Sequence, residues 1–284
     1  MNDSANPPDL FEVVDSRRLL DQLLLDSRLY TQSKDYLELL DFIVRLRNFA
    51  PFNAMLLQIQ RPGLSYAASA RDWRERFGRW PKERSRPLLI MWPFGPVALV
   101  YDVIDTEGEP LSEDVEAFNA RGPIDESKIH SFVGRLSGRQ IEWYWFDGGD
   151  NSAGAIRLLR TSIDKKIGNH YRLFINQNHM PPTQFATLAH ELGHLFLGHL
   201  WPDPKLSIKD RSRLTHEQKE LEAESVSYIV CLRNGVGTKS ETYLRNYVND
   251  NTRLDSVDIY SVAHAAGEVE RLLDLTSKML FDRP

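Results

Sequence analysis

The residues with the clearest chemistry are 190–194, which read His-Glu-x-x-His inside an apolar run from 185 to 197. The length and apolar character of this run predict a helix, on which residues four apart share a face. His190 and His194 can therefore hold one zinc ion, at roughly 2.0–2.1 Å from each nitrogen. Glu191 follows His190 and can take a proton from a water in the open position of the metal. The alternative is that both histidines are core residues with protein partners.

A catalytic zinc site needs a third protein ligand. His199 is the nearest candidate in the sequence, but the long metzincin motif has its third histidine one residue later, so His199 is assigned only to the neighbourhood of the site. A carboxylate from a second predicted helix, 217–230, is the better candidate. On that helix Glu220 and Glu224 are four residues apart. A glutamate-rich helix is usually a solvated acidic face, but the small Ala223 and the apolar flanking residues argue against full exposure.

Residues 190–224 resemble the ImmA/IrrE-like zinc metallopeptidases, a gluzincin group. In these proteins the His-Glu-x-x-His helix is followed by a helix reading Glu-x-x-Ala-(Asn/Asp/Glu), and here residues 220–224 read Glu-Leu-Glu-Ala-Glu. The resemblance covers roughly the C-terminal half of the chain. It implies that His190, His194 and Glu220 are the three metal ligands. It also implies that Glu191 is the general base and that Glu224 orients a ligand histidine. Glu222 stays a rival third ligand, because the alignment of the second helix with the family motif rests on five residues.

Composition places the chain in a broad class. Its 284 residues with 42% hydrophobic content suit one large or two modest domains with real cores. The net charge of −5 gives no strong preference of the whole chain for nucleic acid. The single cysteine, Cys231, excludes a disulfide framework and indicates a reducing compartment. The first residues do not read as a secretory signal, and the longest apolar stretch, 88–101, is too broken to span a bilayer. We therefore expect a cytoplasmic protein without a membrane partner.

The apolar periodicity predicts an α+β protein with two domains. A disordered lead at 1–12 precedes an N-terminal helical and β domain at 13–122, and the resemblance implies that 123–284 is a zincin-like domain with a small sheet and two ligand helices. The expected helices and strands are, in chain order, helices at 19–24, 33–44 and 53–60, strands at 87–92 and 97–103, helices at 112–119 and 125–136, and strands at 140–146, 155–160 and 170–176. In zincins a strand placed like 171–175 lines the cleft, so we expect it to pair with an extended substrate.

A basic segment lies in the first domain. Residues 45–86 carry ten arginine or lysine residues and three acidic residues, a net charge of +7. Arginines for phosphate and aromatic rings for base stacking are what a single-strand binder needs. The candidates for nucleic-acid or partner binding are Arg71, Trp73, Arg74, Arg76, Arg79 and Trp80. The simpler interpretation is a solvated basic helix whose aromatic residues belong to the core.

Scattered motifs at 53–62, 73, 89–93 and 101–108 resemble the N-terminal domain of ArdC-like antirestriction proteins. Those proteins pair a single-stranded-DNA-binding domain with a C-terminal zincin-like domain. Residues 79–86 depart from that pattern, because the family usually has a turn rich in glycine and lysine there.

These observations lead to one main expectation and one alternative. The main expectation is a zinc-dependent endopeptidase with one zinc per chain, manganese being the less favoured metal. The resemblance implies one specific protein substrate, such as a transcriptional repressor, in stress, mobile-element or phage-related regulation. His199 and His216 are the candidate donors to the transition state. The alternative is an ArdC-like protein that binds single-stranded DNA and has a structural or non-proteolytic metal site.

Overall fold

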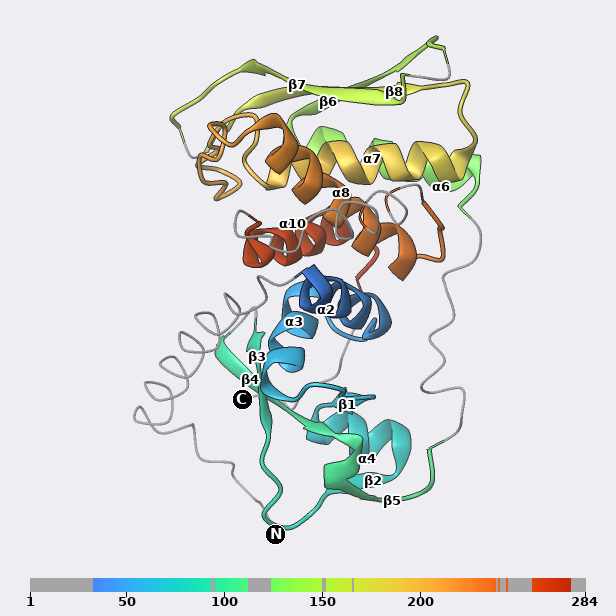
Figure 1. The fold of residues 1–284 in the computed structure, drawn as a ribbon, viewed down its shortest axis with the longest axis vertical. Helices are drawn as coiled ribbons and strands as arrows, with labels where there is room; N and C mark the ends of the chain where they lie inside the picture. Colours follow the sequence, from blue (N-terminus) through green and yellow to red (C-terminus); the bar gives the residue numbers. More distant parts are fainter. Residues whose placement is uncertain are drawn as a thin grey trace.

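The structure is a computed structural model that describes residues 33–92, 95–111, 124–149, 152–164, 166–238, 240, 244 and 257–276. The expected lead at 1–12, the helices at 19–24 and 112–119, and the boundary at 122 lie outside these residues. Helices and small sheets alternate in layers (Figure 1), which confirms the predicted α+β class. Within the described ranges, no helix has the length and apolar character needed to cross a lipid bilayer.

The first half of the chain contains helices that pack on small antiparallel sheets. Its elements are α2 Ser33–Arg45, α3 Pro51–Gln60, β1 Ala67–Ala68, α4 Ala70–Phe77, β2 Arg79–Pro81, β3 Leu88–Trp92, β4 Gly95–Asp102, η2 Val103–Asp105 and β5 Thr106–Gly108. Strands β1, β4 and β3 form one sheet in that order, and β2 pairs with β5. Helix α3 begins with Pro51 at its first position, where the missing N–H costs no hydrogen bond. The helix expected at 53–60 is therefore present, and it begins two residues earlier than expected.

The second half contains a three-stranded sheet and the helices that carry the site. Its elements are α6 Glu126–Gly134, η3 Leu136–Arg139, β6 Ile141–Phe146, β7 Gly154–Arg160, β8 His170–Asn176, α7 Pro181–Phe196, α8 His216–Arg233 and α10 Ile259–Leu272. The sheet lies over α7 (Figure 1) and has the order β6-β8-β7, with β6 parallel and β7 antiparallel to β8.

One sequence-based expectation about this sheet is wrong. The strand expected to pair with substrate is β8, but β8 is the central strand and its backbone is already paired on both sides. Strand β7 is an edge strand, and the amide of its residue Ile156 points away from β8 toward α7. A substrate strand can only add to an unpaired edge, so β8 cannot pair with one, and β6 and β7 are the edge strands of this sheet.

A continuous hydrophobic core joins the two halves of the chain. Helices α2 and α3 pack against α8 and α10, which lie between them and the upper sheet (Figure 1). The buried Tyr36 of α2 donates a hydrogen bond of 2.6 Å to Ser225 of α8. The division into domains at residue 122 stays a prediction, and the first helices share their core with the ligand helix α8.

Trp73 of α4 belongs to a second, smaller core. Its ring is fully buried between Tyr66 and Phe77, and its indole N–H donates to the carbonyl of Tyr101 at 2.9 Å. A ring held in this way has no free face, so the expectation that Trp73 stacks on a nucleic-acid base is wrong. The simpler interpretation, in which the aromatic residues of the basic segment are core residues, is correct for Trp73.

We expect Trp73→Ala to lower the free energy of unfolding by about 3–5 kcal/mol, because it removes a large buried side chain and leaves a cavity. Trp80 is the matched control, since its side chain is 52% exposed. Trp80→Ala should change stability by no more than about 0.5 kcal/mol. Denaturant unfolding of both variants measures the difference, and equal small effects would contradict the burial of Trp73.

Candidate metal centre

Helix α7 places the two histidines on one face. Pro181 starts the helix at its first position, and most of the side chains that turn inward are apolar. Because His190 and His194 are four residues apart, their rings lie side by side with centroids 4.8 Å apart. Gly193 lies between them on the side of α8. A β-carbon at Gly193 would lie 3.2 Å from the side chain of Val226, so glycine allows the two helices to approach closely.

Helix α8 provides the carboxylates. It begins with a capping box, in which Thr215 and Gln218 satisfy each other's backbone amides. Glu220 and Glu224 face α7, with partly exposed side chains. Glu222 is fully buried on another side of α8, where it contacts His199 and Arg211. The position of Glu222 excludes it as a rival ligand in this arrangement, and Glu220 is the glutamate that joins the histidines.

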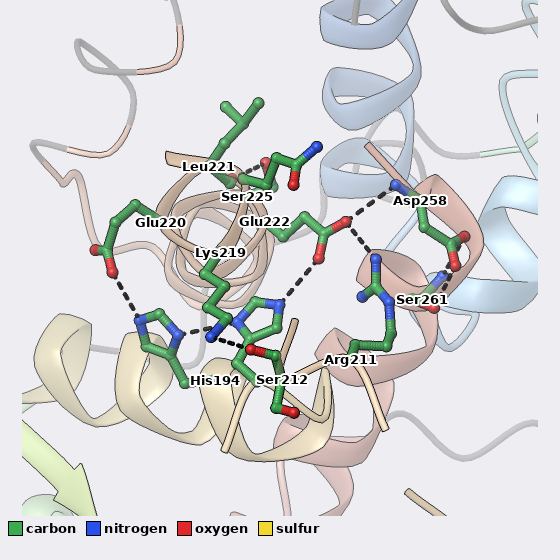
Figure 2. A network of polar contacts seen from close by, with 12 residues as sticks. His194, Arg211, Ser212, Lys219, Glu220, Leu221, Glu222, Ser225, Asp258 and Ser261 are labelled. Atoms are coloured by element: carbon green, nitrogen blue, oxygen red, sulfur yellow. Dashed lines mark hydrogen bonds and ion pairs between the residues drawn. The ribbon is translucent and has the colours of Figure 1, made fainter. Parts of the chain in front are cut away.

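Three donor atoms converge between the helices. The Nε2 atoms of His190 and His194 are 3.1 Å apart. The carboxylate of Glu220 lies 3.5 Å from Nε2 of His190 and 3.4 Å from Nε2 of His194, a contact drawn in Figure 2. Ligands of a tetrahedral zinc ion at roughly 2.0–2.1 Å from the metal lie about 3.3 Å from one another. The two Nε2 atoms and the Glu220 carboxylate, which reaches each ring with a different oxygen, are therefore close enough to share one zinc ion.

The other ring nitrogen of each histidine also has a partner. Nδ1 of His190 lies 3.5 Å from Glu224, and Nδ1 of His194 lies 2.9 Å from Nδ1 of His199. Partners of this kind orient ligand histidines in metal sites. The position of Glu224 is the one that the resemblance implied for it.

Burial and charge act differently on the pKa values of the two histidines. Burial opposes protonation of His190, but its hydrogen bond with Glu220 and the nearby carboxylates outweigh burial and raise its pKa. Burial and the charge of His190 lower the pKa of His194. The hydrogen bond with His190 lowers the pKa of Glu220. His194 and Glu220 therefore favour the deprotonated forms that bind metal.

Glu191 lies between the helix and the edge strand β7. Its Oε2 accepts a hydrogen bond of 2.8 Å from the backbone amide of Ile156. Burial raises the pKa of Glu191, although the charge of His190 opposes the shift. A raised pKa suits a carboxylate that must accept a proton and later return it. The sequence indicated the role of Glu191 but gave no sign of its contact with Ile156.

A cavity of about 420 Å³ opens beside these groups. His190, Glu191, Glu220 and Glu224 line it together with polar residues of α7 and α8. Its wall includes Ala153, which directly precedes β7, and His179, which lies just before α7. Sequence reasoning missed both of these residues, because neither belongs to a motif.

The two candidate transition-state donors have different surroundings. His199 is only 4% exposed and contacts His194 and Glu222, so it cannot reach a substrate, and its assignment as a donor is wrong. Burial also lowers the pKa of His199. His216 has an exposed side chain, and its Nδ1 lies 3.5 Å from Glu220. His216 therefore remains a candidate donor at the rim of the site.

The six candidate binding residues of the first half lie on α4 and β2, at the end of the molecule opposite to α7 (Figure 1). Arg71 pairs with Glu75, and Arg76 pairs with the buried Asp72. Arg79 donates to the backbone carbonyls of Thr106 and Glu109. Arg74 and Trp80 are exposed. Intramolecular contacts thus occupy part of this set, and its binding of nucleic acid or a protein stays a prediction.

Glu220→Ala should weaken zinc binding far more than the roughly 10–100-fold loss that follows removal of a partner behind a ligand. The reason is that only Glu220 contributes a carboxylate to the triangle of donor atoms. Glu224→Gln should give a loss within that smaller range, because Glu224 contacts the outer nitrogen of His190. Competition with a zinc chelator measures both, and equal losses would contradict the assignment of Glu220 as a ligand.

Three comparisons with known proteins place the chain beside its relatives. Residues 150–253 match the family model of the IrrE N-terminal-like domain, Peptidase_M78. No curated protein matches the chain. The metal-free crystal structure of the antirestriction ArdC protein from plasmid R388 aligns with 92% of this chain and 95% of that chain, at 15% sequence identity and a TM-score of 0.36. The matched range contains the two helical histidines, Glu191 and Glu220, so this part of the chain is similar to the IrrE N-terminal-like domain.

Proposed function

We propose that this protein is a zinc-dependent endopeptidase that cleaves an extended segment of another protein. One observation carries the proposal. Two Nε2 atoms and a carboxylate stand 3.1 to 3.5 Å apart, the spacing of zinc ligands, beside a buried glutamate and the cavity. The match to a peptidase family supports the same conclusion.

The residues of the site have separate roles in this proposal. His190, His194 and Glu220 would hold the metal, which when bound supplies a Lewis acid for the scissile carbonyl and makes water acidic near neutral pH. Glu191 takes a proton from the attacking water and passes it to the leaving amine. Its contact with Ile156 keeps its carboxylate at the wall of the cavity.

The edge strand β7 supplies the surface for an extended substrate. A β-carbon at Gly154 would lie only 2.5 Å from the side chain of Thr187, so glycine allows β7 to lie close against α7. The edge of β7 that faces away from β8 lies next to this cavity, because Ala153 lines the cavity and the Ile156 amide of that edge donates to Glu191. An added substrate strand would present its backbone carbonyl next to Glu191, which is the geometry that endopeptidase action requires.

The substrate in this proposal is one specific protein, for which a transcriptional repressor is the leading candidate. Repressors encoded next to the gene for this protein should be incubated with it in the presence of zinc, and the products examined by mass spectrometry. We expect one cleavage site, absent when Glu191→Gln replaces the wild-type protein. Failure to cleave any candidate, together with failure to cleave denatured protein substrates, would contradict peptidase activity.

A further inference from the structure

The turn after α7 brings a third histidine to the metal centre. Gly198 adopts a left-handed conformation with φ 76°, and its amide donates to the carbonyl of Leu195. The amide of His199 donates to the carbonyl of His194, which completes a Schellman turn. A β-carbon at Gly198 would lie 2.0 Å from the carbonyl oxygen of Lys209, so only glycine fits. The turn brings the His199 side chain into contact with His194.

The side chain of His199 connects His194 to the buried ion pair between Glu222 and Arg211. Nδ1 of His199 lies 2.9 Å from Nδ1 of His194, and its Nε2 lies 3.0 Å from Oε2 of Glu222. The other oxygen of Glu222 accepts from Arg211 at 2.6 Å and from the backbone amide of Asp258 at 3.1 Å. Figure 2 shows the carboxylate of Glu222 directed toward both Arg211 and Asp258, on the side of α8 away from Glu220.

Burial lowers the pKa of both His194 and His199, and with both rings neutral the donors and acceptors of this chain have one consistent order. The Glu222 carboxylate only accepts, so Nε2 of His199 must carry a proton and donate it. A neutral imidazole has one donor and one acceptor, which makes Nδ1 of His199 an acceptor. Nδ1 of His194 must then carry the proton. Nε2 of His194 is left without a proton, as an acceptor that faces Nε2 of His190 at 3.1 Å and is available to a metal ion.

We propose that Glu222 and His199 are positioning residues that hold His194 in the tautomer whose Nε2 binds the metal. The proposal rests on metal binding by His190, His194 and Glu220. Arg211 and the amide of Asp258 keep the buried Glu222 in its acceptor role. The arrangement ties three separate elements to one ligand nitrogen: the turn after α7, helix α8, and the start of α10.

The alternative is that these buried polar groups only stabilise the fold. The two interpretations differ in what Glu222→Gln would do. The amide oxygen should remain on the side of Arg211 and Asp258, which both donate, so the amide N–H₂ would face Nε2 of His199. His199 would then accept at Nε2 and donate from Nδ1. The proton on His194 would move to Nε2, the nitrogen that faces the metal, whereas a purely structural role predicts no change of tautomer.

The first measurement is the tautomer of His194 in metal-free protein. A two-bond ¹⁵N–¹H correlation spectrum of protein labelled with ¹⁵N-histidine separates the two forms, and the His194→Ala and His199→Phe variants assign the signals. We expect a proton on Nδ1 of His194 in the wild-type protein and on Nε2 in Glu222→Gln. A proton on Nε2 in the wild-type protein, or no change in Glu222→Gln, would overturn the proposal.

The second measurement is zinc affinity, by competition with a fluorescent chelator. Glu222→Gln and His199→Phe should each weaken binding by about 10–100-fold, while Glu217→Gln, at an exposed position of α8, should leave it unchanged. His199→Phe keeps a ring in place and decides the matter if Glu222→Gln does not fold. Wild-type affinity in the folded variants would overturn the proposal. Failure of wild-type protein to bind zinc would instead contradict the proposed function, because the tautomer is read without metal.

Discussion

Glu191→Gln is expected to lower the rate of peptide hydrolysis by about 10²–10⁴-fold, the usual contribution of a general base, and to leave zinc binding intact. Glutamine cannot take a proton from water, but its amide oxygen can still accept the hydrogen bond from Ile156, so the wall of the cavity should keep its shape. The hydrolysis rate on a protein that the wild-type enzyme cleaves measures the first effect. The zinc content of the purified variant measures the second.

Two comparisons make this result specific. Glu217→Gln changes an exposed glutamate on α8 and should retain wild-type activity. His190→Ala should lose both activity and metal, because it removes one corner of the donor triangle. If Glu191→Gln retained activity, another group would have to be the base, and the role of Glu191 would be wrong.

The second large effect concerns stability, at the buried Arg233 near the end of α8. Arg233 donates to the backbone carbonyls of Ile43 and Phe49, at and beyond the end of α2, and to Glu270 of α10 at 2.6 Å. Both charged side chains are almost fully buried. Arg233→Met would leave Glu270 without its partner and the carbonyls without a donor. We expect a loss of about 3–5 kcal/mol in the free energy of unfolding, typical of breaking a buried pair.

A double variant separates the charge from the packing. Arg233→Met with Glu270→Met should recover part of the loss, since replacing a whole buried pair by apolar groups is often tolerated. Arg271→Met is the matched control, because Arg271 is 59% exposed in its pair with Glu268 and surface pairs contribute little. Denaturant unfolding of the three proteins gives the values. A loss for Arg233→Met no larger than that for Arg271→Met would contradict the role of Arg233 in joining α2, α8 and α10.

The parts of the site that depend on local geometry could be predicted from the sequence. His190 and His194 share a face because they are four residues apart on one helix, and this relation does not depend on the rest of the fold. The three strands of the second half were also predicted close to their observed bounds, because their apolar patterns and turns are local signals.

The parts of the site that depend on contacts between distant residues could not be predicted from the sequence. The choice of β7 over β8 depends on the order of strands in the sheet, which no strand's own sequence contains. The alternatives for the third ligand were separated only by the rotation of α8 against α7, which places Glu220 toward the histidines and Glu222 toward Arg211. The burial of Trp73 follows from its contacts with Tyr66 and the carbonyl of Tyr101. His199 lay close to the motif in sequence, but the turn at Gly198 decides what it contacts.

The most direct test of the metal centre is anomalous X-ray scattering from a crystal of the zinc-treated protein, recorded on both sides of the zinc absorption edge. We expect one zinc peak per chain, roughly 2.0–2.2 Å from Nε2 of His190, Nε2 of His194 and a carboxylate oxygen of Glu220. A zinc ion bound through Glu222 or His199, or the lack of any zinc peak between His190 and His194, would contradict this assignment of the metal ligands.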